Sequence, residues 1–96
     1  MKQMNIFKTL TVYAAKWAVK DTRPFDAEEV DMVEKALVVP SQYGNSVQFT
    51  LKSGGLTFIP LSSDSTLTVG CEIDLTKAKI VTLTKPGEND IIRILA

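Results

Sequence analysis

Few of the residue types that most often carry chemistry in proteins occur in this chain. It contains no histidine and a single cysteine, Cys71. Without histidine there can be no Ser-His-Asp or Cys-His arrangement, and one cysteine alone cannot build a zinc site. Cys71 follows Gly70 in a predicted strand, so we interpret it as a small buried hydrophobic residue. We therefore expect a protein that is not an enzyme and that carries no metal or cofactor.

Two pairs of acidic residues are the remaining candidates for metal binding or acid–base chemistry. Glu72 and Asp74 alternate along a predicted strand and so share a face, whereas Glu88 and Asp90 flank a turn. Neither pair has the ligand density of a calcium loop. We interpret both pairs as solvated surface.

Aromatic, amide and basic side chains give a better indication of binding. Single-stranded nucleic acid is commonly held by aromatic rings beside basic side chains, and one predicted hairpin presents such a combination on its outward face. The predicted nucleic-acid contacts are Tyr43, Gln48, Lys52 and Phe58, with Lys77 and Lys79 as further contacts to phosphate.

Phe58 also allows two structural interpretations. In the first, its ring packs beneath the N-terminal segment, against Trp17 or Tyr13, in a second small core. In the second, Phe58 and Leu56 stay exposed and form a contact between two copies of the chain.

The charges are balanced overall but unevenly distributed. Eleven basic and eleven acidic residues give a net charge of zero. Residues 1–25 hold five basic side chains and one acidic one, and residues 26–40 hold five acidic and one basic. Neutrality argues against tight, nonspecific phosphate binding, and the basic first segment reduces that objection without removing it.

One short helix is clearly signalled near residues 27–35. Asp26 can cap the N–H groups of a helix that begins at Ala27, and Glu29 completes a capping box. Residues 5–20 fit two conformations, because apolar side chains recur at helical spacing while residues 9–13 favour a strand. We expect a helical or irregular extension over residues 1–14, then a strand over residues 15–20 and a turn at residues 21–24.

The remainder of the chain is typical of short strands separated by turns. Predicted strands cover residues 36–39, 46–52, 56–61, 79–84 and 91–95, and residues 66–69 and 71–75 flank a bend at Gly70. A three-residue loop at 53–55 would pair Phe49 with Ile59 and Val47 with Leu61, with Leu51 opposite Thr57. That register gathers the apolar side chains on one face and leaves Phe58 outward. A two-residue loop would instead place apolar side chains of the second strand on the polar face.

Five or six short strands and one helix in 96 residues predict a single domain with a mainly β fold. We expect a small closed or half-closed β-barrel, OB-like or SH3-like, because closure removes exposed strand edges. The N-terminal residues lack the uninterrupted apolar stretch of a signal peptide, and no segment approaches about 20 apolar residues. A cytoplasmic protein without membrane contact is therefore expected.

Residues 36–93 resemble short OB-fold-like proteins of gut Bacteroidales and their phages. The resemblance is carried by Ser41-Gln42-Tyr43-Gly44, Lys52-Ser53-Gly54-Gly55, Ile59-Pro60-Leu61, Val69-Gly70 with Asp74-Leu75, and Asp90-Ile91-Ile92-Arg93. None of these motifs is a catalytic signature. The resemblance implies a β-barrel that binds single-stranded DNA as a replication accessory.

Two functions therefore remain open from the sequence. The first is a small binding protein for single-stranded nucleic acid. The second is a structural or protein-interaction subunit that self-associates through an edge strand or through the apolar patch at Leu56 and Phe58.

Overall fold

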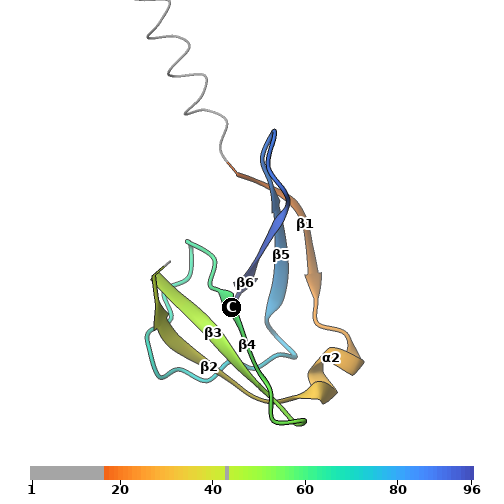
Figure 1. Ribbon diagram of the computed structural model, residues 1–96, viewed down its shortest axis with the longest axis vertical. Coiled ribbons are helices and arrows are strands. Elements are labelled where there is room, and N and C mark those ends of the chain that lie inside the picture. Colours follow the sequence, from red (N-terminus) through yellow and green to blue (C-terminus); the bar gives the residue numbers. More distant parts are fainter. Residues whose placement is uncertain (1–16, 43) are drawn as a thin grey trace, which may run out of the picture.

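The computed structural model describes residues 17–42 and 44–96, which form a mainly β fold (Figure 1). Two antiparallel three-stranded sheets have the strand orders β1-β5-β6 and β2-β3-β4. The elements are β1 (Ala18–Pro24), α2 (Ala27–Met32), β2 (Val33–Ser41), β3 (Gly44–Leu51), β4 (Leu56–Pro60), β5 (Lys79–Thr84) and β6 (Ile91–Leu95). The mainly β prediction is thus confirmed.

Helix α2 begins where the capping residues predict. The Asp26 side chain accepts a hydrogen bond from the Glu29 N–H (2.8 Å), and the Glu29 carboxylate accepts one from the Asp26 N–H (3.0 Å). The helix is shorter than predicted, because Val33 already has an extended backbone and pairs with Leu51. Residues 33–35 therefore belong to β2, the conformation that β-branched Val33 favours.

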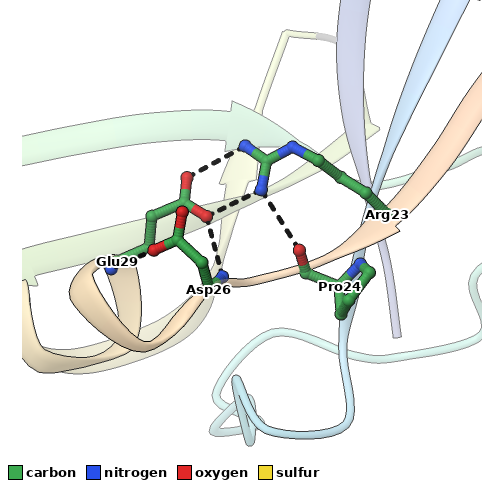
Figure 2. Close-up of polar contacts among 4 residues, drawn as sticks. All are labelled: Arg23, Pro24, Asp26 and Glu29. Atoms are coloured by element: carbon green, nitrogen blue, oxygen red, sulfur yellow. Dashed lines mark hydrogen bonds and ion pairs between the residues drawn. The ribbon is translucent and has the colours of Figure 1, made fainter.

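An ion pair joins α2 to the end of β1 (Figure 2). Arg23 donates from Nη1 and Nη2 to the two carboxylate oxygens of Glu29, at 2.7 and 3.0 Å. Nη1 also donates to the Pro24 carbonyl (3.1 Å). Phe25, between the strand and the helix, places its ring 6.0 Å from that of Phe49 in β3. The β1–α2 junction is therefore held by a bidentate ion pair outside and an aromatic contact inside.

The sheet β2-β3-β4 presents one face to the core. Ala36 pairs with Phe49 and Val38 with Val47, and all four side chains are at most 3% exposed. The predicted alternation of β3 is thereby confirmed. Strand β2 is longer than the predicted segment 36–39, since it continues through Pro40 to Ser41.

The hairpin β3–β4 has a register two residues away from the predicted one. Phe49 pairs with Thr57 and Val47 with Ile59, so the predicted pairs with Ile59 and Leu61 are wrong. The turn places Gly54 at a φ of +97°, with the Gly54 N–H bonded to the Leu51 carbonyl. Because the shift is an even number, the same side chains still face the core.

In the second sheet, β5 and β6 have the predicted bounds, but β1 does not. Its strand runs through Pro24, so the turn predicted at residues 21–24 is wrong. The Asp-Thr-Arg-Pro sequence is accommodated because β1 is an edge strand, where proline costs no ladder hydrogen bond. A bulge at Lys20 interrupts the pairing with β5. The predicted extension over residues 1–14 lies outside the described residues.

Residues 62–78 connect the sheets without forming a strand, so the strand predicted after Gly70, at residues 71–75, is wrong. The segment instead lies beside β2 through a bridge between Glu72 and Leu37 and a bond from the Ile73 N–H to the Ala36 carbonyl (2.9 Å). Gly70, with φ +98°, provides the bend that the sequence predicts. Cys71 is half-buried, more exposed than predicted, and packs at the margin of the core.

The two sheets meet beside one end of β4. Leu61 forms a parallel bridge with Ile94, and the Ser62 N–H donates to the Ile94 carbonyl (2.8 Å). Beyond this bridge the sheets separate around an apolar groove of about 340 Å³, whose walls include Ile59 of β4 and Ile92 of β6. Among the described residues no closed barrel is seen, because no further pairing joins β4 to β6.

No helix within residues 17–42 and 44–96 is long and apolar enough to cross a membrane.

Candidate nucleic-acid interface

The outward face of the hairpin β3–β4 carries two large apolar side chains. Phe58 lies opposite Gln48, and Leu56 lies opposite Thr50. The exposed fractions of Phe58 and Leu56 are 54% and 57%. Directly opposed residues of an antiparallel pair point to the same face of the sheet. Gln48 and Phe58, two of the predicted contacts, are therefore brought together on this surface.

Strand β2 extends this surface on the other side of β3. Leu37 lies opposite Gln48, and Lys35 lies opposite Thr50. Lys35 is exposed and Leu37 is half-buried. We call this surface, made of Lys35, Leu37, Gln48, Thr50, Leu56 and Phe58, the hairpin face. It combines an aromatic ring, an amide and an ammonium group.

Lys52 lies at one end of the hairpin face. It follows β3 directly, and its N–H donates to the Met32 carbonyl at the end of α2 (2.9 Å). Its side chain is exposed. Lys52 therefore adds a second cation to the one that Lys35 provides. Tyr43, predicted in the loop between β2 and β3, lies outside the described residues.

The structure separates Lys77 and Lys79 from the hairpin face. Lys77 lies in a turn, where its N–H donates to the Asp74 carbonyl (3.0 Å). Lys79 is the first residue of β5 and lies between Pro24 and Leu95 in the other sheet. Both lysines are exposed, but neither belongs to the strands that carry Phe58.

A second surface, which the sequence interpretation missed, lies on the outward face of the sheet β1-β5-β6. A concavity of about 420 Å³ is bounded by the sheet and by the loop at residues 62–64. Trp17 lines it at one end, with the Lys85 Nζ 5.9 Å from the centroid of the indole ring. Arg93 of β6 lines it as well. We call this surface the Trp17 concavity.

The separation in sequence explains why the concavity was missed. Trp17 lies beside Lys85 because Ala18, the next residue, pairs with Thr84, and Arg93 enters the same concavity because it pairs with Val81. No local pattern around Trp17 indicates this pairing. A lone tryptophan beside a predicted strand was the available signal, and by itself it indicates packing as readily as binding.

The candidate acidic residues have local partners. Asp74 accepts hydrogen bonds from the Thr76 hydroxyl and N–H, which lower the pKa of its carboxyl. Asp90 accepts from Lys20 at 2.7 Å, and this bond lowers the pKa of Asp90 and raises that of Lys20. Within the described part of the chain, no group of three or more acidic or cysteine side chains is arranged to hold a metal ion.

The thiol of Cys71 has one polar neighbour. Its sulfur lies 3.6 Å from the Thr68 hydroxyl, and this contact lowers the pKa of the thiol. The Thr68 hydroxyl is not a general base that could activate the thiol.

No family model, curated protein or solved structure matches the chain.

Proposed function

We propose that this protein is an OB-like binding protein for single-stranded nucleic acid, and that the hairpin face holds the strand. The observation that carries the proposal is the half-exposed ring of Phe58 directly opposite Gln48. A ring in this position offers a stacking surface for a base. The amide of Gln48 beside it can donate to or accept from a base edge.

The strand order supports the OB-like assignment. OB folds are partly open five-stranded barrels that bind oligonucleotides on the face of their second and third strands. Here β1 pairs with β5, the chain continues through α2, and β2 pairs with β3. If β1 and β2 are the two halves of an interrupted first strand, β3 and β4 become the second and third strands. The parallel bridge from Leu61 to Ile94 then marks the seam between the third strand and the last.

The energetics favour a binder of modest affinity. Each stacked base contributes about 1–3 kcal/mol. Lys35 on the hairpin face and Lys52 at its end supply two cations for contacts to phosphate. Two such contacts on a single strand give a slope of about −1.4 for the logarithm of the binding constant against that of the salt concentration. This small slope agrees with a chain of zero net charge.

Fluorescence anisotropy of a labelled, mixed-sequence single-stranded oligonucleotide tests the proposal, at low and physiological salt and with a duplex control. We expect preference for the single strand and weaker binding at higher salt. Phe58→Leu removes the ring but keeps an apolar side chain, and we expect it to weaken binding about tenfold, equivalent to about 1.4 kcal/mol. Phe58→Tyr keeps the ring and should bind as the parent does. No binding at low salt would refute the proposal.

Self-association through the hairpin face is the second candidate, and the exposure of both Leu56 and Phe58 favours it. Association through the edge strand β1 has less support, since a bulge, Lys20 and Pro24 all obstruct pairing with another strand. Light scattering across a concentration series distinguishes the two functions. A mass that doubles with concentration, and returns to that of the monomer in Phe58→Ala, would favour self-association.

A further inference from the structure

We propose that the Trp17 concavity is a second contact site for the same single strand, holding one base on the indole and its phosphate at Arg93 and Lys85. This inference rests on the proposed function for the class of ligand, but it concerns the opposite sheet. A strand bound at both sites would pass around the domain, from the hairpin face to the sheet β1-β5-β6.

The indole of Trp17 is placed to stack. Its residue is 37% exposed, and the Lys85 ammonium lies 5.9 Å from the ring centroid. A cation at this distance is attracted to the ring and restrains its orientation. The same ammonium can contact a phosphate that accompanies a base at the edge of the ring. One aromatic ring and one cation are thus already adjacent before any ligand binds.

The shape of the concavity suits a nucleotide. Its volume of about 420 Å³ falls within the usual range of small-ligand sites, about 300–1,000 Å³. Two side chains of the central strand line it, the buried Val81 and the half-buried Leu83, and Ile91 of β6 lies opposite Leu83. Ser62 and Ser63 line the other wall. The apolar side chains suit the ring face of a base, and the serines suit a polar sugar.

The charges also suit an anion. Arg93 donates from Nη1 to the Ile92 carbonyl (2.9 Å) and forms no ion pair with a described residue. Lys79 lies on the same face, two residues before Val81 along β5. Among the described residues that line the concavity, Asp64 is the one acidic side chain. The nearby Asp90 is neutralised by Lys20.

A peptide would use this surface differently. An apolar segment would cover Leu83 and Ile91 but leave the guanidinium of Arg93 without an anionic partner. An acidic segment would pair with Arg93 but would not use the indole. A nucleotide engages both, because it joins a planar aromatic base to a phosphate. The combination of ring and cation in one concavity is what favours nucleic acid.

The test uses the intrinsic fluorescence of Trp17, which is the single tryptophan of the sequence. An unlabelled oligodeoxythymidylate of about 12 nucleotides, within the usual site size of about 4–16 per OB fold, is titrated into the full chain. We expect saturable quenching of Trp17 emission with the same midpoint as the anisotropy of a labelled copy. Raising the salt concentration should move both midpoints together.

Matched variants separate this site from the hairpin face. We expect Arg93→Gln to weaken binding about tenfold, as for the loss of one charge-assisted hydrogen bond, and Lys85→Gln to weaken it in the same direction. Lys77→Gln removes the same charge from a turn outside the concavity and should have little effect. Phe58→Leu should reduce affinity but leave the quenching at saturation unchanged.

The outcomes distinguish the two proposals. Binding seen by anisotropy without any change in Trp17 emission, and unaffected by Arg93→Gln, would overturn the second site and leave the hairpin face standing. Full quenching whose midpoint does not shift in Phe58→Leu would support the concavity and refute the hairpin face. No response of either probe at low salt would overturn both. Quenching that does not weaken with salt would also overturn the phosphate contact.

Discussion

Replacing Glu29 with glutamine tests how strongly the β1–α2 junction stabilises the fold. The Arg23 guanidinium, bonded to both oxygens, and the Asp26 N–H hold the pKa of Glu29 at about 2, below its ordinary value of 4.5. At about 1.4 kcal/mol per pKa unit, this difference corresponds to about 3 kcal/mol. Solvent screens much of it, because the side chains of Glu29 and Arg23 are 28% and 46% exposed.

Partly exposed ion pairs contribute about 0.2–1 kcal/mol, so we expect Glu29→Gln to lower the free energy of unfolding by about 1 kcal/mol at pH 7. For a domain of this size the loss corresponds to a fall in Tm of about 4–8 °C. Glu28→Gln is the matched control, since it removes the same charge from the same helical turn. No described partner bonds to the Glu28 carboxylate, and we expect little change.

The pH dependence has a definite sign. Because the folded pKa of Glu29 is depressed, its contribution is complete above about pH 4.5 and is lost as the pH falls towards 2. Urea unfolding of the parent and of Glu29→Gln, followed by circular dichroism from pH 7 to pH 2, measures this directly. The difference in the free energy of unfolding between the parent and Glu29→Gln should disappear as the pH falls from about 4.5 towards 2. A difference that stays constant with pH, or equal effects of Glu28→Gln and Glu29→Gln, would refute the reasoning.

Two further substitutions test the hairpin and the seam. Gly54→Ala should destabilise the fold by about 1–2 kcal/mol, because Gly54 has a φ of +97°. Gly55→Ala should be nearly neutral, because its new methyl group would meet Leu51 at an ordinary 3.6 Å. Thermal melts compare the two variants, and a larger loss for Gly55→Ala than for Gly54→Ala would contradict the register. Ile94→Ala should lower the free energy of unfolding in urea by about 2–4 kcal/mol, because Ile94 is fully buried at the bridge between the sheets. Ile92→Ala changes a position on the same strand that is 42% exposed, and it should lower the free energy of unfolding clearly less. Equal losses of stability would contradict the placement of the core.

Local signals in the sequence were sufficient for several elements. The capping box at Asp26 and Glu29 fixes the start of α2, since both partners lie within four residues. The strands 79–84 and 91–95 were predicted with their observed bounds, because turn residues delimit both of them. The outward position of Phe58 also follows from alternation alone.

Elements that depend on distant partners were beyond local reasoning. The pairing of β1 with β5 turned a predicted turn into a strand, and it also brought Trp17 to Lys85. The hairpin register required knowing which of two adjacent glycines adopts positive φ, and alternation specifies the register only to within two residues. Lys79 was grouped with Phe58 because the sequence does not state which sheet each strand joins.

The pairing of β1 with β5 also sets the order in which the domain can assemble during synthesis. Its partners Pro24 and Lys79, and Ala18 and Thr84, lie 55 and 66 residues apart. The strands β2, β3 and β4 follow one another closely and can pair while the nascent chain is still short. Strand β1 must instead wait, with Trp17 exposed to solvent, until residues 79–84 have left the ribosome. The interval is one in which a chaperone can bind the N-terminal strand.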